Sequence, residues 1–173
     1  VRSSHRTLHL DTYSSKIFSL SHILHFTGLT SLCIMRQTEL TSVDDWLSHL
    51  PLLESLWITS CSLTHLPSKT FQNNTLLQSL HLSSNKLTSS GIRKAFNPLA
   101  SLVQLWLNEN KLHSLSGFHR LTKLRSLWVC RNKIDRIGDH LKHNVQLEEL
   151  NISDNRIGCF KELLNLGSLS RLR

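Results

Sequence analysis

The sequence predicts an α/β solenoid, a curved horseshoe with parallel strands on the concave face and short helices and turns on the convex face. Three observations predict it. A pattern of spaced leucines around an asparagine recurs along the chain, its period is nearly constant, and the segments between the copies vary in length without disturbing it. All 173 residues are expected in a single solenoid, because each unit buries its apolar face only against its neighbours.

The repeated pattern is LxxLxLxxNxL, and it is clearest in LVQLWLNENKL from Leu102. Seven copies start at residues 5, 29, 53, 77, 102, 124 and 147, and an eighth, LSRLR from Leu169, is cut short. The starts are 22 to 25 residues apart. A period of about 20–29 residues with this pattern is typical of a leucine-rich repeat solenoid. Because neither end shows a polar capping repeat, we expect a fragment of a longer chain.

Each repeat should place a short strand at xxLxLxx, where side chains alternate between two faces. In the fifth repeat, Leu105 and Leu107 point into the core. Asn110 ends the strand, and its amide can satisfy backbone groups that the turn leaves unpaired. Asparagine recurs at this position as Asn85, Asn110, Asn132 and Asn155, whereas Tyr13, Gln37 and Cys61 replace it in the first three repeats. A regular asparagine ladder is therefore expected only from the fourth repeat onward.

Two of the segments between strands should contain short helices. TSSGIRKAFNPLAS places Ile92, Ala95 and Phe96 at helical spacing. In SVDDWLSHL, Ser42 is the expected N-cap and the two aspartates belong to the first turn. Trp46 in this segment is expected in the core on the convex side.

The residue between the two core leucines of each strand forms a column on the concave face. The column is His9, Cys33, Trp57, His81, Trp106, Trp128 and Asn151, which includes three of the four tryptophans in the chain. Exposed aromatic patches mark interaction sites, and tryptophan is enriched in binding hot spots. We therefore expect a protein partner on this face. The alternative is that the indoles lie flat on adjacent strands and stabilise the sheet.

Charge divides between the two sides of the predicted solenoid. The outward residues of the strand side are basic at Arg6, Arg36, Arg125 and Arg131, and acidic at Asp11, Glu54, Glu109, Glu148, Glu149 and Asp154. These four positive and six negative charges give −2 on the concave face, although the chain carries +8. A partner of mixed charge should be oriented by them. The expected partner-binding residues are Trp57, His81, Trp106, Trp128, Arg125, Arg131, Glu109 and Glu149.

The remaining positive charge lies in turns and on the return side, which raises nucleic-acid binding through a basic convex surface as an alternative. The basic residues avoid the aromatic column, however, and stacking platforms for bases need the two interleaved. Nucleic acid is therefore disfavoured, and a solvated convex surface is the expected state.

Catalytic and metal-binding patterns are weak. The histidine pairs in HILH and HLKH have no acidic or cysteine ligands at a recognisable spacing. Cys130 beside Arg131 could have a lowered thiol pKa, but no histidine follows it in a nucleophile arrangement. No glycine-rich phosphate loop and no run of about 18 apolar residues occur. We expect no enzyme activity, no cofactor or metal, no small-molecule substrate and no membrane span.

Cysteine usage favours a cytoplasmic protein. Cys33, Cys61, Cys130 and Cys159 form no CxxC pair and no capping cluster, as expected of reduced thiols. Glycosylation sequons at Asn73 and Asn151 point the other way. The first alternative is therefore a fragment of an extracellular recognition receptor.

NKLHSLSGFHRLTKLRSLWVCRNKIDRI resembles intracellular leucine-rich repeats of the phosphatase-regulatory class. Roughly residues 29–158 also resemble repeats of the leucine-rich repeat-containing protein 9 family. The similarity is clearest in LESLWITSCSLTHL and LVQLWLNENKLHSLSGF. This resemblance implies a non-catalytic scaffold in a cytoskeletal or ciliary setting. The longer segments LPSKTFQNNTLL and SSGIRKAFNPLASL depart from it, because they are closer to the 24-residue type common in extracellular repeats.

Overall fold

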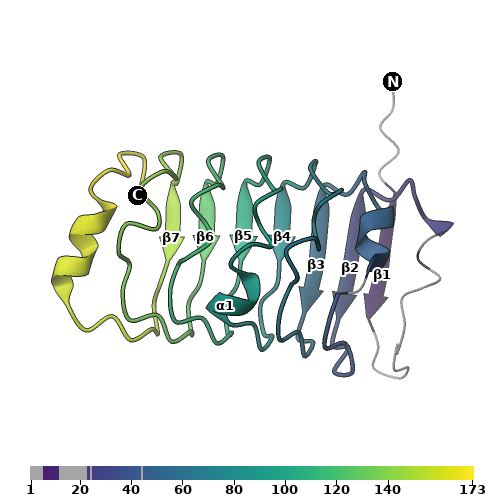
Figure 1. Ribbon diagram of the computed structural model, residues 1–173, viewed down its shortest axis with the longest axis horizontal. Helices are drawn as coiled ribbons and strands as arrows, with labels where there is room; N and C mark the ends of the chain where they lie inside the picture. Colours follow the sequence, from purple (N-terminus) through teal and green to yellow (C-terminus); the bar gives the residue numbers. More distant parts are fainter. Residues whose placement is uncertain (1–5, 12–22, 24, 44) are drawn as a thin grey trace.

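The computed structural model describes residues 6–11, 23, 25–43 and 45–173. In this part of the chain, seven parallel strands form one sheet in the order in which they occur in the sequence. They are β1 (Thr7–Asp11), β2 (Ser31–Met35), β3 (Ser55–Thr59), β4 (Ser79–His81), β5 (Gln104–Trp106), β6 (Ser126–Trp128) and β7 (Glu149–Asn151). Figure 1 shows them side by side along the long axis of the molecule. The predicted solenoid is confirmed.

The strands pair in the register that the leucine pattern dictates. Leu80 pairs with Leu105, and Leu105 pairs with Leu127. A slip of one residue would turn every core leucine toward solvent, so the alternating pattern fixes the register strongly. The equivalent leucines Leu32, Leu56, Leu80, Leu105 and Leu127 are all fully buried. Every strand position of a repeat is therefore stacked on its counterpart in the next repeat.

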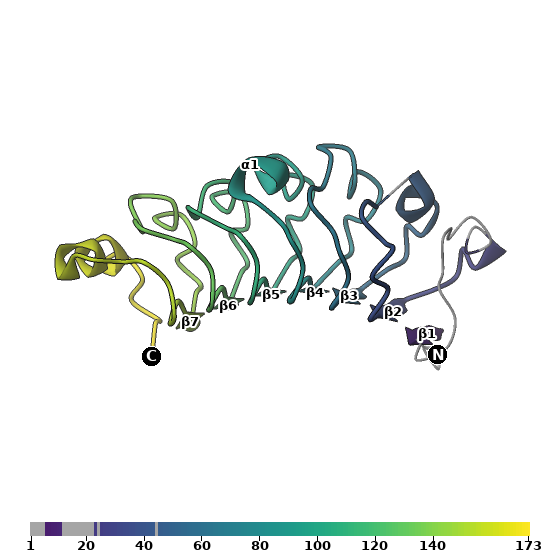
Figure 2. The same ribbon diagram turned by 90° about the horizontal axis from the view of Figure 1, so that it is seen from below.

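The sheet forms the inner side of an arc, and the return segments form the outer side (Figure 2). The rings of Phe71, Phe96 and Phe118 fill the outer side, with centroids 6.1 and 5.9 Å apart along the series. All three rings are fully buried. Because strands and return segments have different widths, the stack curves with the strands on its concave face.

Both predicted helices are present, but they are short. Helix α1 (Ser89–Ile92) begins after Thr88, whose hydroxyl accepts a hydrogen bond from the Gly91 amide at 3.2 Å. Ala95 and Phe96 are buried but lie beyond its end. After Ile92 the chain continues in turns with i to i−3 hydrogen bonds.

The second predicted helix is a 3-10 helix, η2 (Asp45–His49). Trp46 is buried in it, as predicted. Its first described residue is Asp45, and the predicted N-cap, Ser42, lies three residues upstream. Asp44 lies outside the described residues. A further 3-10 helix, η3 (Phe160–Leu166), follows β7.

The asparagine ladder forms where it was predicted. The Nδ2 of Asn110 donates to the carbonyls of Leu82 and Leu107 at 3.0 and 3.1 Å, and its Oδ1 accepts from the Leu87 amide at 3.0 Å. The same contacts recur at Asn85, Asn132 and Asn155. Each side chain thus links two neighbouring repeats.

In the second to seventh repeats, the residue immediately before the ladder position has a left-handed backbone conformation. These residues are Arg36, Ser60, Ser84, Glu109, Arg131 and Asp154, with φ between 53° and 58°. Such a conformation costs a non-glycine residue free energy and persists only where the surroundings hold it. In the early repeats, Gln37 and Cys61 contact the carbonyl two residues before them, so those rungs are less regular, as predicted. Tyr13 lies outside the described residues.

A second set of buried asparagines lies on the return side and was not predicted. The Nδ2 of Asn74 donates to the Leu47 and Leu50 carbonyls at 3.1 and 2.8 Å. Asn144 bonds the Phe118 and Leu121 carbonyls in the same way, at 3.1 and 2.8 Å. These two side chains tie the convex halves of neighbouring repeats together, as the ladder ties the strand ends.

The truncated eighth repeat starts at Leu172, three residues later than predicted, because Arg173 pairs with Glu148 as Glu148 pairs with Arg125, the residue after the first leucine of its repeat. Leu169 is buried, and the Arg173 amide donates to the Glu148 carbonyl at 3.0 Å. Among the helices of the described residues, none has the length and apolar character needed to cross a membrane.

Candidate protein-binding face

The predicted column lies along one line of the sheet. Trp57 pairs with His81, His81 with Trp106, and Trp106 with Trp128, on strands β3 to β6. Trp57 is 37% exposed, and the other three side chains are half-buried. The four central side chains predicted for partner binding are therefore adjacent and accessible from the concave side.

Three of these four rings are stacked face to face. The centroids of Trp57 and His81 are 3.7 Å apart with an interplanar angle of 16°. Those of His81 and Trp106 are 3.8 Å apart at 11°. The imidazole is therefore held between two indoles, and the rings support the sheet through cross-strand packing, as the alternative interpretation expected. Among the stacked pairs of the described residues, none includes Trp128, so its ring extends the column without joining the stack.

The small polar residues of the preceding column hold the polar edges of the rings. The indole N–H of Trp57 donates to the Ser55 hydroxyl at 3.2 Å. The Ser79 hydroxyl lies 3.1 Å from Nε2 of His81. Burial lowers the pKa of His81 from 6.5 to about 4, because the space between the indoles disfavours the charged imidazolium. The centre of the face is therefore ordered and uncharged near neutral pH.

The charged residues predicted for this face form ion pairs or hydrogen bonds within the chain. Arg131 contacts Glu109 at 2.8 Å and Asp154 at 3.5 Å. Arg125 contacts Glu148 at 3.7 Å, at the opposite end of β6. The two arginines thus flank Trp128 along its strand, as predicted, while their charges are balanced by carboxylates of neighbouring repeats.

The predicted carboxylates also accept hydrogen bonds from serine. Glu149 accepts from the Ser126 hydroxyl at 3.0 Å. Glu109 accepts from Ser84 at 2.9 Å, and this bond, followed by those from Arg131, lowers the pKa of the Glu109 carboxyl. The charged border of the column is an ordered network, which the sequence pattern did not reveal because its partners lie 22 to 25 residues apart.

Burial acts on the thiols of Cys33, Cys61 and Cys130. Burial raises the pKa of Cys130 despite the opposing charge of Arg131, so the lowered pKa expected from their adjacency is wrong. Cys33 and Cys61 are buried as apolar residues, and burial raises their pKa values too. In the part of the chain that the structure describes, no three histidine, cysteine or acidic side chains are grouped as metal ligands.

Comparisons with known proteins match the repeats along most of the chain. Models of the leucine-rich repeat match residues 51–112, 100–143 (two copies) and 146–171. Keratocan from Mus musculus is 32% identical over 125 residues, 66% of this chain and 35% of keratocan. Lumican from Gallus gallus is 33% identical over 131 residues, 75% of this chain and 36% of lumican. The chain thus spans about a third of the length of either relative.

A solved structure supports the same architecture. Internalin C2 from Listeria monocytogenes str. 4b F2365 superposes with a TM-score of 0.77 at 26% identity, over 91% of this chain and 65% of the internalin.

The relatives overturn the predicted cytoplasmic location. Keratocan and lumican are secreted proteins of the extracellular matrix, and they point to an extracellular setting for this chain. The cytoskeletal or ciliary setting and the finer resemblance to the phosphatase-regulatory class find no support among them. The cysteine argument failed for a physical reason. Cys33 and Cys61 occupy interior repeat positions, so their free thiols reflect packing and carry no information on the redox compartment.

Proposed function

The chain belongs to the leucine-rich repeat family, and from this premise we propose that it is an extracellular, non-catalytic recognition segment. It would bind a partner protein on the concave strand face, as part of a receptor ectodomain or of a matrix protein. The observation that carries the proposal is the accessible aromatic column of Trp57, His81, Trp106 and Trp128.

The stack suits binding because its rings are already ordered. Side chains that are fixed before association lose little conformational entropy when a partner covers them. The Ser55 and Ser79 contacts satisfy the ring edges, and neutral His81 avoids the cost of burying a charge. Stacking and binding are therefore compatible roles for the same rings.

The border of the column indicates which contacts would set affinity and which would set orientation. Arg125 and Arg131 are exposed and already paired, so a partner gains little by pairing with them again. Apolar contact with Trp57 and Trp128 would supply most of the affinity. The partner surface should therefore be apolar at its centre, with mixed charges around it that fix orientation.

The experiment begins with the labelled chain and a panel of secreted proteins and receptor ectodomains. For each protein bound, the dissociation constant is measured against the intact chain and the Trp57→Ala/Trp128→Ala variant. A loss of at least about 30-fold is expected, because truncating hot-spot residues removes about 2 kcal/mol or more.

The matched control removes apolar side chains from another surface. Phe160 and Leu164 are exposed on η3, outside the sheet, so Phe160→Ala/Leu164→Ala should keep the affinity of the intact chain. Circular dichroism establishes that all variants are folded. Equal affinity of the intact chain and the tryptophan variant for every bound protein would refute the concave aromatic column as the interface.

A further inference from the structure

Positive charge is concentrated in the central repeats. Residues 55–134 contain ten lysines and arginines and one acidic residue, Glu109, which gives them +9. The remainder of the chain contains ten basic and eleven acidic residues, or −1. Because Glu109 lies beside the concave face and pairs with Arg131, the return segments between residues 55 and 134 have no carboxylate of their own, and Asp135 and Asp139 follow in the segment that contains His140.

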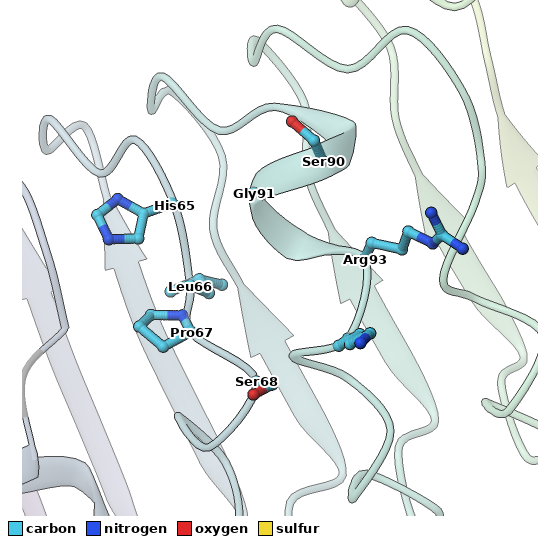
Figure 3. A pocket seen from close by; sticks show the side chains of 8 residues that line it. His65, Leu66, Pro67, Ser68, Ser90, Gly91 and Arg93 are labelled. Atoms are coloured by element: carbon cyan, nitrogen blue, oxygen red, sulfur yellow. The ribbon is translucent and has the colours of Figure 1, made fainter.

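Two grooves adjoin each other on this basic return side. The first, of about 520 Å³, lies between residues 65–68 and α1 with the residues that follow it. Figure 3 shows His65 and Pro67 on one side, Ser90 and Arg93 on the other, and the Arg93 guanidinium extending away from His65. The second groove, also about 520 Å³, lies between this same segment and the return segments of the next two repeats. Arg93 and Lys94 line both grooves, so the two are adjacent, and we refer to them together as the basic depression, which this segment divides.

Close backbone approach between repeats shapes this depression. The Leu66 amide donates to the Gly91 carbonyl at 2.9 Å, which fixes one wall of the first groove. Gly117 has φ of +102°, and a Cβ there would lie 2.7 Å from the Arg93 carbonyl oxygen. Only glycine permits this approach without strain. The segment that carries Arg93 and Lys94 is therefore held firmly from both sides.

The cations of the grooves lack the partners that the concave arginines have. Arg93, Lys94 and Arg120 are exposed, and within the described part of the chain no carboxylate pairs with any of them. Asp139, next to the groove residue His140, is already paired with Lys142 at 2.9 Å. Serines contribute hydroxyl groups to both linings. The result is a set of uncompensated positive charges and hydrogen-bond donors along a depression that crosses several repeats.

We propose that these two grooves form a binding site for a sulfated polysaccharide, held by Arg93, Lys94 and Arg120. A linear polyanion can span both halves of the depression across the segment of Arg93 and Lys94, and it releases counterions when it meets a row of uncompensated cations. Neither lining includes a phenylalanine, tyrosine or tryptophan. Single-stranded nucleic acids are usually held by base stacking on such rings, which favours a ligand recognised through its charges alone over a single strand. The site is separate from the concave aromatic column and does not depend on its function.

The test measures binding of a fluorescent heparin oligosaccharide to the full chain, at several salt concentrations. The intact chain should bind with an affinity that falls as salt rises, and desulfated heparin should bind weakly. The Arg93→Ser/Lys94→Ser/Arg120→Ser variant should lose at least about tenfold in affinity. Arg93→Lys/Arg120→Lys, which keeps the charge, should retain most of the binding. Trp128→Ala should have no effect, which separates this site from the concave face.

The matched control is Arg156→Ser/Lys161→Ser/Arg171→Ser, which also removes three exposed positive charges but lies outside both grooves. It should bind heparin like the intact chain. Equal losses in the two triple variants would overturn the proposal, because the attraction would then belong to net charge and not to the grooves. Absence of heparin binding at low salt would also overturn it. Equally tight binding of single-stranded DNA through the same three residues would replace the polysaccharide with nucleic acid.

Discussion

The concave face and the return-side grooves carry arginines in opposite states. On the concave face, Arg131 contacts Glu109 and Asp154, and Arg125 contacts Glu148. In the grooves, Arg93 and Arg120 have no carboxylate partner among the residues described. The difference teaches that net charge does not locate the binding chemistry. A face whose charges are already paired can bind a partner through its apolar column, whereas a face with unpaired cations can bind a ligand through charge.

Both faces are held in place by the same stack of repeats, and Asn110→Ala should destabilise this stack most strongly. The change leaves the buried Leu87 amide without its side-chain partner, and the Leu82 and Leu107 carbonyls each lose one of two bonds and keep those from Asn85 and Asn132. Each such loss is costly, so the free energy of unfolding should fall by about 3 kcal/mol or more. Urea denaturation measures it. The exposed Asn97→Ala serves as control and should change stability by less than about 0.5 kcal/mol.

Gly117→Ala should disturb the groove side selectively. The new Cβ would approach the Arg93 backbone, and the residue would need a left-handed φ of +102°. A loss of about 2–3 kcal/mol in the free energy of unfolding is expected, together with weaker heparin binding. Gly158→Ala is the matched control, because its Cβ would meet no atom within 4 Å. If Gly117→Ala and Gly158→Ala were equally stable, the close approach of repeats at the groove would be wrong.

His81 should make the concave face sensitive to acid. The unfolded chain protonates this histidine below its ordinary pKa of 6.5, whereas the folded chain resists protonation until about pH 4. The unfolded state therefore binds more protons between these values, and stability falls as pH drops through this window. His81→Gln should remove about 1 kcal/mol of that fall, allowing for partial solvent exposure. Urea midpoints at pH 7 and pH 4.5 compare the two chains, and an unchanged pH dependence would contradict the buried, neutral imidazole.

The smallest expected effect is on carboxylate pKa values, and it compares the substitution of a paired arginine with that of an unpaired one. Arg131→Gln should raise the pKa of Glu109 toward its ordinary value, because two of the four causes that act on it come from Arg131. Ser84 still donates to the carboxylate, so the rise should be partial. Arg93→Gln should leave the titration of every carboxylate unchanged. NMR titration of the glutamate side chains measures both, and a carboxylate that responds to Arg93→Gln would contradict the unpaired state of that arginine.

The sequence predicted what recurs at fixed positions of each repeat and missed what depends on ring orientation or on the return segments. The strand leucines, the ladder from Asn85 onward and the column of Trp57, Trp106 and Trp128 follow from one periodic pattern. The insertion of His81 between two indoles does not, because it depends on ring orientations on three different strands.

The end of α1 at Ile92 was missed for a similar reason. The buried positions of Ala95 and Phe96 fit a helix and a series of turns equally well. The grooves escaped prediction because their linings come from return segments of different lengths, where the repeat pattern no longer aligns the residues. The predicted location rested in part on Cys33 and Cys61, whose burial is structural and is explained by packing.

Oxidative footprinting of the chain, with and without a protein found in the ectodomain panel, tests the central claim most directly. Oxidation of Trp57 and Trp128 should fall several-fold in the complex, whereas exposed Phe160 on η3 should keep its labelling. Unchanged labelling of both tryptophans, with protection elsewhere on the chain, would show that the partner binds another surface and that the stacked rings only stabilise the sheet.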